Sequence, residues 1–465
     1  MAELLFHGAA GEVTGSMHMI RLDGRWIALD CGLFQGSRDA SEAKNRQWPV
    51  PPKEISAVVL SHAHTDHSGR LPKLVRDGFE GPIYCTPATR DLCAIMLPDS
   101  AHIQEEDIFY VNKKRQRKGL PPIEPLYGYK DALAAIGLMQ TVSYNRWVQV
   151  EQGLLAMFQE AGHMLGSAGV RLEFAKRNGD TRSLYFSGDV GRLNIPVLRD
   201  PADMPPADVV LCESTYGGRV NEVAGDARVK FVRIVRDTVE RGGKVIIPAF
   251  SVGRTQTLVY YLNQEFTSGG LPCIPVYVDS PLAVDATSVF KMHPECYDAE
   301  ARQFQARNGD LLGNRCVTYI RDVEESKELH ELKKPCVIIS ASGMCEAGRI
   351  RHHIKNNVEN PANTLLIVGY QAQNTLGRRL AEGVKAINLF HETYQVRARV
   401  EQIHGFSAHA DQSDLLRMLR PIKNDAKRVF LVHGEEDQAD TLAGKLRGEG
   451  FASVERAQRG QRVAL

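Results

Sequence analysis

The sequence predicts an α/β protein with two or more domains. Its 465 residues exceed what one ordinary hydrophobic core accommodates. The apolar runs have the length of strands, and they end in polar residues or glycine. In the second half of the chain these runs alternate regularly with segments of helical spacing. That alternation is typical of a parallel sheet covered by helices.

Composition and charge exclude several classes of protein. Hydrophobic residues make up 43% of the chain and charged residues 24%, as in globular proteins. No apolar run approaches membrane-spanning length. The N-terminus lacks the basic start and long apolar stretch of a signal peptide, so we expect a cytoplasmic protein. The nine cysteines form no C-x-x-C pair or framework, which favours unpaired thiols in a reducing compartment.

Net charge is no guide to a nucleic-acid partner, because it is only +1. One local run, KKRQRKG from Lys113 to Gly119, is strongly basic. A solvated loop or helix end is the simpler interpretation of such a run, and contact with a polyanion is the alternative.

The first half of the chain is expected to hold short strands mixed with helices. Strands are expected within residues 26–32, 57–62, 153–163, 183–189 and 208–214. Each of these segments is an apolar run of strand length that ends in polar residues or glycine. A helix is expected over residues 67–78.

The second half begins with a helix over residues 230–243, which ends at a glycine pair. Strands are expected within residues 244–250, 274–280, 334–343 and 363–371, with a helix within 254–266. His352 and His353 have no ligand spacing to other residues and are expected on a helix surface. Residues 427–450 indicate one strand, a loop and one helix, after which we expect no appended domain.

Acids and imidazoles recur at the ends of the expected strands. The residues in this position are Asp30, His62, His163, Asp189, Glu213 and His433. A single histidine beside an apolar run is usually a hydrogen-bonded structural residue. Six such side chains favour a shared site, because equivalent strand ends of one sheet converge on one crevice in open α/β folds.

The segment HAHTDH, which begins at His62, has the spacing of a metal site. His62 and His64 point to the same side of an extended chain, so both can bind one ion. Asp66 and His67 are adjacent at the expected helix start and must point differently. Two ions that share a carboxylate fit this geometry better than one tetrahedral ion. Nitrogen and oxygen ligands without cysteine suit zinc, with Mn²⁺ or Fe²⁺ as alternatives.

The same segment resembles the signature of the metallo-β-lactamase superfamily, an αββα sandwich of two-metal hydrolases. Asp30 in LDCG, His163 in GHMLGSA and Asp189 in SGDVG follow in the order of that family. Other segments resemble its β-CASP branch, and within it the RNA nucleases of the cleavage-and-polyadenylation-specificity type and their bacterial relatives. These segments are ESTYGG, PAFSVGRTQTL, ASGM, GYQAQNTLGR, FSAHAD and LVHGE.

The resemblance implies a role for each matching position. One metal ion is implied to bind His62, His64 and His163. The other is implied to bind Asp66, His67 and His433. Asp189 is implied to bridge the two ions, and Asp30 to orient a ligand histidine. The implied catalytic residues are Asp66, Glu213 and His409, with His409 and Glu213 supplying a proton to the leaving oxygen.

With this resemblance, the site predicts hydrolysis of RNA phosphodiester bonds, for which two zinc ions would activate water and neutralise the phosphate. A histidine at position 433 goes with RNA-acting rather than DNA-acting members of the branch. Endonuclease activity on single-stranded RNA is expected, with 5′ exonuclease activity and a homodimer left open. Contacts to substrate phosphates are expected from Arg254, Arg378 and Ser407.

The resemblance also implies a domain order. The metallo-β-lactamase domain would span residues 1–212, the β-CASP domain with its parallel sheet residues 213–395, and the completion of the first domain residues 396–465. Two other functions stay open. A hydrolase of a small ester or thioester would need an open, shallow site, which an insert of this size would cover. An RNA-binding subunit without catalysis would have lost metal residues, and here every motif is intact.

Overall fold

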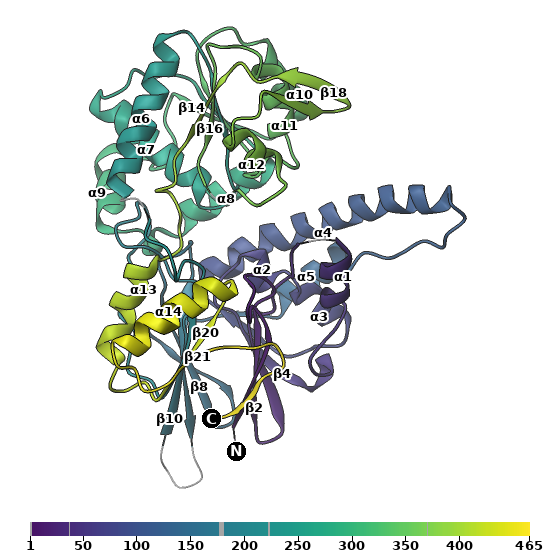
Figure 1. The fold of residues 1–465 in the computed structure, drawn as a ribbon, viewed down its shortest axis with the longest axis vertical. Coiled ribbons are helices and arrows are strands. Elements are labelled where there is room, and N and C mark those ends of the chain that lie inside the picture. Colours follow the sequence, from purple (N-terminus) through teal and green to yellow (C-terminus); the bar gives the residue numbers. More distant parts are fainter. Residues whose placement is uncertain (1, 37, 176–180, 222–223, 370) are drawn as a thin grey trace. The chain divides into compact units, whose positions relative to one another are not determined.

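The computed structural model describes residues 2–36, 38–175, 181–221, 224–369 and 371–465. Its contacts divide the chain into two compact units (Figure 1). Unit 1 contains residues 1–193, 200–220 and 408–465, and unit 2 contains residues 194–199 and 221–407. The domain limits expected at 212 and 395 stay predictions. None of the helices in the described part of the chain has the length and apolar character that a membrane crossing requires.

The first sheet of unit 1 has seven strands in the order β22-β1-β2-β3-β4-β5-β6. They are β1 (Glu3–Gly8), β2 (Met17–Leu22), β3 (Arg25–Leu29), β4 (Ile55–Val59), β5 (Ile83–Cys85), β6 (Met139–Thr141) and β22 (Arg462–Ala464). β1, β2 and β3 pair antiparallel, whereas β3, β4, β5 and β6 pair in parallel. The two ends of the chain meet where β22 pairs with β1.

The second sheet of unit 1 has the order β21-β20-β11-β10-β9-β8-β7. Its strands are β7 (Trp147–Glu151), β8 (Leu154–Glu160), β9 (Ala168–Ala175), β10 (Thr181–Phe186), β11 (Val209–Glu213), β20 (Arg428–Val432) and β21 (Val454–Arg456). β10, β11, β20 and β21 pair in parallel. Their carboxyl ends therefore lie along one edge of the sheet.

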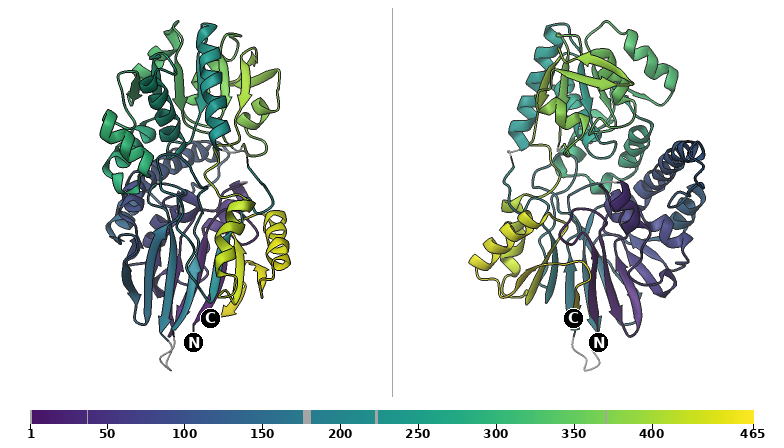
Figure 2. Two further views of the ribbon diagram at one scale, coloured as in Figure 1. Left: turned by 90° about the vertical axis from the view of Figure 1, so that its left-hand side faces the viewer. Right: turned by 45° about the vertical axis from the view of Figure 1, so that its right-hand side comes forward.

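The two sheets pack face to face, because one hydrophobic cluster draws buried side chains from both. Phe6 and Val59 of the first sheet join Phe158 and Leu184 of the second in this cluster. Helices cover the outer faces (Figures 1 and 2). They are α1 (Arg38–Asn45), α2 (Thr65–Ser68), α3 (Leu71–Arg76), α4 (Pro87–Gln116), α5 (Tyr129–Gly137), α13 (Gln412–Leu419) and α14 (Glu436–Gly448). This is the αββα sandwich that the resemblance implies.

Unit 2 is built on a parallel sheet in the order β14-β13-β15-β12-β16-β19. The strands are β12 (Val245–Pro248), β13 (Val276–Asp279), β14 (Val317–Ile320), β15 (Val337–Ser340), β16 (Thr364–Ile367) and β19 (Arg399–Gln402), beside a hairpin of β17 (Ala386–Leu389) and β18 (Glu392–Gln395). Every residue of β12, β15 and β16 is buried. Such strands need cover on both faces, so the expected helix-covered parallel sheet is confirmed.

The helices of unit 2 alternate with these strands along the chain. They are α6 (Ala224–Glu240), α7 (Arg254–Ser268), α8 (Pro281–Met292), α9 (Ala299–Asn308), α10 (Val323–Glu331), α11 (Ile350–Asn357) and α12 (Leu376–Ala381). The helix expected over residues 67–78 is instead two short helices, α2 and α3. Strands β5, β6, β21 and β22 have three residues each, too few to leave a periodic pattern in the sequence.

Two cysteines correct the expectation of unpaired thiols. Cys273 and Cys316 form a disulfide, with Cα atoms 5.8 Å apart. They precede the paired strands β13 and β14, in which Val276 lies beside Val317. Sheet register therefore brings them together, and their separation of 43 residues offers no spacing signal. The other seven cysteines lie outside this disulfide and are buried.

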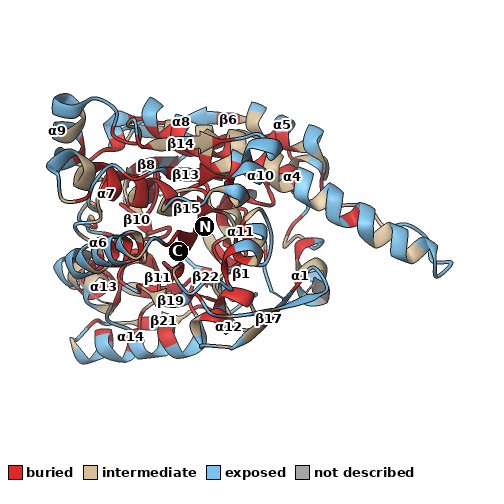
Figure 3. Cartoon of the chain, turned by 90° about the horizontal axis from the view of Figure 1, so that it is seen from above, coloured by how far each residue is buried: buried red, intermediate tan, exposed pale blue. Residues whose placement is uncertain are grey.

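The basic run from Lys113 to Gly119 lies at the end of α4 and in the turn after it, where nearly every residue is exposed. Figure 3 shows this part of α4 extending away from the buried sheets. This location agrees with the simpler interpretation of the run as a solvated helix end.

Candidate metal centre

The strand-end acids and histidines of unit 1 come together. Asp30 and His62 follow strands of the first sheet, whereas His163, Asp189, Glu213 and His433 belong to strand ends of the second. The site therefore draws on both sheets, which corrects the expectation of a single sheet. Among the residues that the structure describes, three groups have ligand atoms within 4.8 Å of one another: His62, His64, His163 and Asp189; Asp66, His67 and His433; and Asp189, Glu213 and His433.

The first group is built by an extended segment between β4 and α2. β4 ends at Val59, and His62 and His64 follow in extended chain, which turns both to one side. His64 Nδ1 lies 3.2 Å from His62 Nε2 and 3.2 Å from His163 Nε2. Three imidazole nitrogens therefore face one point.

The second group lies where α2 meets the end of β20. Because α2 begins directly after His64, Asp66 and His67 lie on a helical turn and not in the extended segment that holds His62 and His64. His433 Nε2 lies 3.0 Å from His67 Nε2 and 3.4 Å from Asp66 Oδ2. His433 has a φ of 48°, which is uncommon for a residue other than glycine. Thr215 Oγ1 lies 3.1 Å from its Nδ1.

Asp189 stands between the two groups and faces each with a different oxygen. Its Oδ2 lies 3.6 Å from the Nε2 atoms of both His62 and His163. Its Oδ1 lies 3.2 Å from His67 Nε2 and 3.4 Å from His433 Nδ1. One carboxylate thus reaches both sets of ligand atoms.

Asp30 is fully buried behind His67 and fixes its ring. The carboxylate lies 2.6 Å from His67 Nδ1. It accepts hydrogen bonds from the Ser61 backbone N–H at 2.7 Å, from Ser61 Oγ at 3.0 Å and from Ser16 Oγ at 3.2 Å. With Nδ1 held in this way, His67 presents Nε2 to the site.

Glu213 and His409 form a pair beside Asp189. His409 Nδ1 lies 3.4 Å from Glu213 Oε1 and 3.9 Å from Asp189 Oδ2. The Val190 backbone N–H donates to the same Glu213 oxygen at 2.6 Å. A backbone bridge between Gly191 and His409 brings the returning C-terminal segment to this position. Glu213 is fully buried, whereas 23% of the His409 side chain is exposed.

Burial keeps the imidazoles of the first group neutral. It lowers the pKa of His62 and of His163 well below the ordinary value, and that of His64 to about 4. A neutral imidazole offers the lone pair that a metal ligand needs. The ring nitrogens of these three neutral histidines converge within hydrogen-bond distance, and such a cluster of lone pairs is suited to bind a cation.

Electrostatic attraction acts in the opposite direction at the second group. Burial disfavours a charge on His67, but Asp189 and Asp30 outweigh it and raise the pKa of His67 well above its ordinary value. Burial likewise disfavours the ionised form of Asp66, yet the hydrogen bond from His433 holds its pKa below the usual range. An ion bound by His67 would therefore displace a proton.

The residues fit a metal cofactor. Within the part of the chain that the structure describes, Asp189 Oδ1 is a buried oxygen without a hydrogen-bond partner. The donor set consists of imidazole nitrogens and carboxylate oxygens, which suits zinc and other divalent first-row metals. Access is from one side, because His62 and His163 are buried whereas the side chains of Asp66 and His409 are each 23% exposed.

The three expected phosphate contacts lie in unit 2. Arg254 is the first residue of α7, and its guanidinium lies 5.5 Å from the ring centre of Phe406, the residue before Ser407. Arg378 pairs with Glu382 on its own helix at 2.6 Å. Their contacts with phosphate stay predictions, as do the individual roles of the residues in unit 1.

Sequence patterns do not single out Ser61 or Thr215, which contact the site residues directly. Ser61 bonds both Asp30 and His62, the latter at 3.0 Å from Nδ1, and Thr215 lies against His433. Each is a neighbour of a motif residue in the sequence. Their proximity to His62 and Glu213 is the signal that could have indicated them.

Three family models match the chain. Residues 10–122 match the metallo-beta-lactamase superfamily, residues 255–380 the Beta-Casp domain, and residues 393–455 the Zn-dependent metallo-hydrolase RNA specificity domain. The three matches together include parts of both units.

Several proteins are similar over most of the chain. Ribonuclease TTHA0252 of Thermus thermophilus is 37% identical over 459 residues, which is 98% of this chain and 96% of that protein. The RNase J-like protein of Methanocaldococcus jannaschii is 30% identical and covers 95% of each chain. Transcription termination factor FttA of Methanosarcina mazei is 32% identical over 94% of this chain and 67% of its own.

One solved structure shows the same fold. The crystal structure of a protein of unknown function from Enterococcus faecalis V583 superposes with a TM-score of 0.56 and covers all of both chains. At 12% sequence identity, this similarity concerns the fold alone.

Proposed function

The chain belongs to the β-CASP RNA nucleases of the metallo-β-lactamase superfamily, and we propose from this premise that it cleaves single-stranded RNA as a two-zinc endonuclease. Membership makes it a metal-dependent hydrolase that acts on RNA. The number and identity of the ions, the strandedness of the RNA and the cleavage mode are what the proposal adds. A cytoplasmic location and a homodimer are part of it.

The observation that carries the proposal is the position of Asp189 between two ligand groups. Its two oxygens face different sets of imidazoles, Oδ2 toward His62 and His163 and Oδ1 toward His67 and His433. A carboxylate so placed is suited to bridge two ions. The proposed ligands are His62, His64 and His163 for one ion, and Asp66, His67 and His433 for the other.

The ions would supply an activated water and neutralise charge on the scissile phosphate. The residues of the chain would hold the remaining parts of the reaction in place. Asp66 is the partly exposed carboxylate of the second group, so we assign it the orientation of the attacking water. Asp30 would keep the His67 ring fixed throughout.

The leaving sugar oxygen needs a proton, and His409 is the proposed donor. Burial disfavours a charge on His409, but Glu213 outweighs it and raises the pKa to about 9. His409 therefore carries a proton at neutral pH, and its partial exposure lets it reach a substrate. Glu213 is buried and would stabilise the charged imidazole while it orients the ring.

Cleavage of one RNA, labelled in turn at its 5′ and 3′ ends and incubated with Zn²⁺, tests the proposal. With either label we expect labelled fragments of intermediate length, and we expect no product after chelation. His64→Ala should abolish cleavage, because it removes the imidazole at the centre of the first group. His352→Ala is the matched control, since His352 is exposed on α11 and outside the ligand groups.

Absence of cleavage by the wild type, or equal cleavage by His64→Ala, would contradict ribonuclease activity at this site. If mononucleotides were released only from the 5′ end, the activity would be that of an exonuclease and not of an endonuclease. A parallel panel of small esters and thioesters should give no comparable turnover.

A further inference from the structure

The second half of α4 projects from unit 1 and has few buried residues (Figure 3). All of α4 is described, and seven of its eight buried residues lie between Ala88 and Ala101, with Ile108 as the eighth. The returning loop adds hydrogen bonds from Asn112 to Ile123 and from Arg115 to Pro121. The projecting half runs from His102 to Gln116, and a helix as short as this is only marginally stable in water without packing. A second surface would therefore stabilise it.

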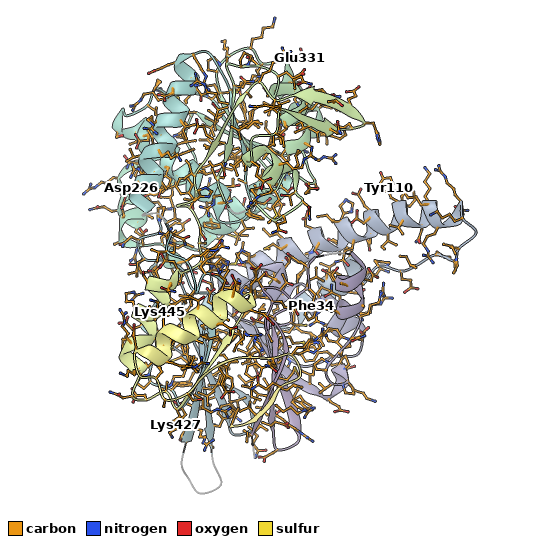
Figure 4. All side chains as sticks on the ribbon, in the orientation of Figure 1. Phe34, Tyr110, Asp226, Glu331, Lys427 and Lys445 are labelled. Carbon is orange, nitrogen blue, oxygen red and sulfur yellow. A yellow bond between two sulfur atoms is a disulfide. The ribbon has the colours of Figure 1, made fainter. Side chains whose placement is uncertain are left out.

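One face of this projecting half is exposed and carries large apolar side chains. Residues three and four apart lie on one side of a helix, and the residues that recur in this way form what we call the α4 stripe. The stripe consists of His102, Ile103, Glu106, Phe109, Tyr110, Lys113 and Arg117, all exposed. Ile103, Phe109 and Tyr110 are 52%, 66% and 63% exposed, and Figure 4 shows Tyr110 near the projecting end. Grouped exposed apolar residues indicate an interaction site.

Charge is segregated on either side of the aromatic pair. Three acids, Glu105, Glu106 and Asp107, precede Phe109, and the basic residues Lys113, Lys114 and Arg115 follow Tyr110. The segment is therefore complementary to itself when reversed. A two-fold axis at the aromatic pair places Glu106 of one copy opposite Lys113 of the partner subunit. It also places Phe109 opposite Tyr110 of the partner subunit.

We propose that the α4 stripe is a homodimer interface in which two copies of this chain pack antiparallel around a two-fold axis at Phe109 and Tyr110. Such an interface is isologous, as in most soluble dimers. Parallel packing would bring like charges together. An RNA partner would explain the basic end alone, because the acidic run would repel its phosphates. The inference specifies the surface of the homodimer named in the proposed function, and it does not depend on RNA cleavage.

A charge swap on the full chain tests the interface. Sedimentation velocity at increasing concentration measures the dimer, and Lys113→Glu should weaken it roughly tenfold, because the symmetric interface then holds two like-charged pairs. Glu106→Lys should do the same. The double variant Glu106→Lys/Lys113→Glu restores opposite charges and should recover the dimer. Lys130→Glu is the matched control, since Lys130 is exposed on α5 outside the stripe.

A second variant tests the interface by cross-linking, which does not depend on charge. The seven cysteines outside the disulfide are buried, so Tyr110→Cys adds an exposed thiol, and mild oxidation should link two subunits. Circular dichroism should show the wild-type helix content in every variant. A wild type that stays monomeric at all concentrations would overturn the proposal, as would a dimer unaffected by Lys113→Glu. A monomer in which Lys113→Glu weakens the binding of labelled single-stranded RNA would assign the basic end to RNA instead.

Discussion

Asp30 controls a proposed ligand without being placed to bind metal itself. Its carboxylate is fully buried and contacts His67 Nδ1 at 2.6 Å. Ser16 and Ser61 donate three further hydrogen bonds to this carboxylate. The position of Asp30, with a φ of 60° at the end of β3, directs the carboxylate to the ring rather than along the strand.

Replacing Asp30 should weaken metal binding. In Asp30→Ala the His67 ring loses its partner, and metal affinity should fall about 10- to 100-fold. Competition with a chromophoric chelator measures this affinity. Asp226→Ala, an exposed position in unit 2, is the control. An unchanged affinity in Asp30→Ala would show that His67 needs no such support.

His409 should affect the chemical step and not metal binding. His409→Gln removes the proposed proton donor, so the cleavage rate should fall about 10²- to 10⁴-fold while metal content stays at the wild-type level. The loss should be much smaller for an RNA whose leaving oxygen is replaced by sulfur, because a thiolate leaves without a proton. Equal losses with both substrates would remove His409 from this role.

The turns between elements hold the site as tightly as its side chains do. An ideal Cβ on Gly32, just after β3, would lie 1.6 Å from the Asp66 carbonyl oxygen and 2.8 Å from the His67 nitrogen. Only glycine therefore allows the end of β3 to approach α2. This close approach places Asp66 and His67 beside Asp30.

A methyl group at this position should displace α2. Gly32→Ala is expected to lower the free energy of unfolding by about 3 kcal/mol and to reduce metal content. Gly444→Ala is the control, because a Cβ there meets nothing within 4 Å on α14, and it should gain up to about 1 kcal/mol. Urea denaturation of both variants measures the difference. A Gly32→Ala protein as stable as wild type would show that α2 can move without cost.

Unit 2 has a polar centre of its own at the end of β13. Asp279 is fully buried and lies 2.6 Å from His353 Nε2, 2.7 Å from Arg349 Nη1 and 2.6 Å from Ser326 Oγ. His353 is buried, which corrects its expected place on a helix surface, whereas His352 is exposed. Burial opposes ionisation of Asp279, but the hydrogen bond from His353 and its other partners lower the pKa.

This network should make unit 2 sensitive to acid. Because the folded-state pKa of Asp279 lies below its ordinary value of 3.8, its contribution is fully present above that value and is lost as pH falls through the folded-state pKa. Asp279→Asn should cost roughly 3 kcal/mol at neutral pH, and the difference from wild type should shrink below the ordinary value. Urea denaturation across this pH range measures it. A difference independent of pH would contradict the role of the charge.

At the scale of the whole molecule, the metal centre connects distant parts of the chain. Its groups come from residues near both ends of unit 1, from Asp30 to His433, and from both sheets. Ions bound there act on the folded state alone, so they stabilise it by mass action.

Removing the metal should therefore lower the melting temperature. At a free metal concentration about 1,000 times the dissociation constant, binding adds about 4 kcal/mol. Calorimetry with and without chelator should show this loss for the wild type and a smaller loss for His64→Ala, which lacks a proposed ligand of the first ion but keeps the second group. Identical melting curves for the wild type would contradict metal binding at this site.

Much of the fold can be predicted from the sequence because buried strands of four to eight residues leave a clear pattern. β4, β10, β11, β12 and β20 are such strands. The three-residue strands and the pairing of Cys273 with Cys316 leave none, since they depend on register within a sheet. His353 cannot be told from its exposed neighbour His352 in the sequence either. Which face of a helix is buried depends on what packs against it.

The chemistry of this protein follows from its residues alone: the identity of the donors, their positions at strand ends and the family to which they belong. How those donors divide depends on the fold, which turns Asp189 toward both groups and sets Asp30 behind His67 and Glu213 beside His409. The reason is physical. Local sequence sets where a strand ends, but the distance between two strand ends depends on sheet packing and on close contacts such as that at Gly32. The exposed stripe on α4 belongs to the same category, since only the fold shows which face of a helix is left uncovered.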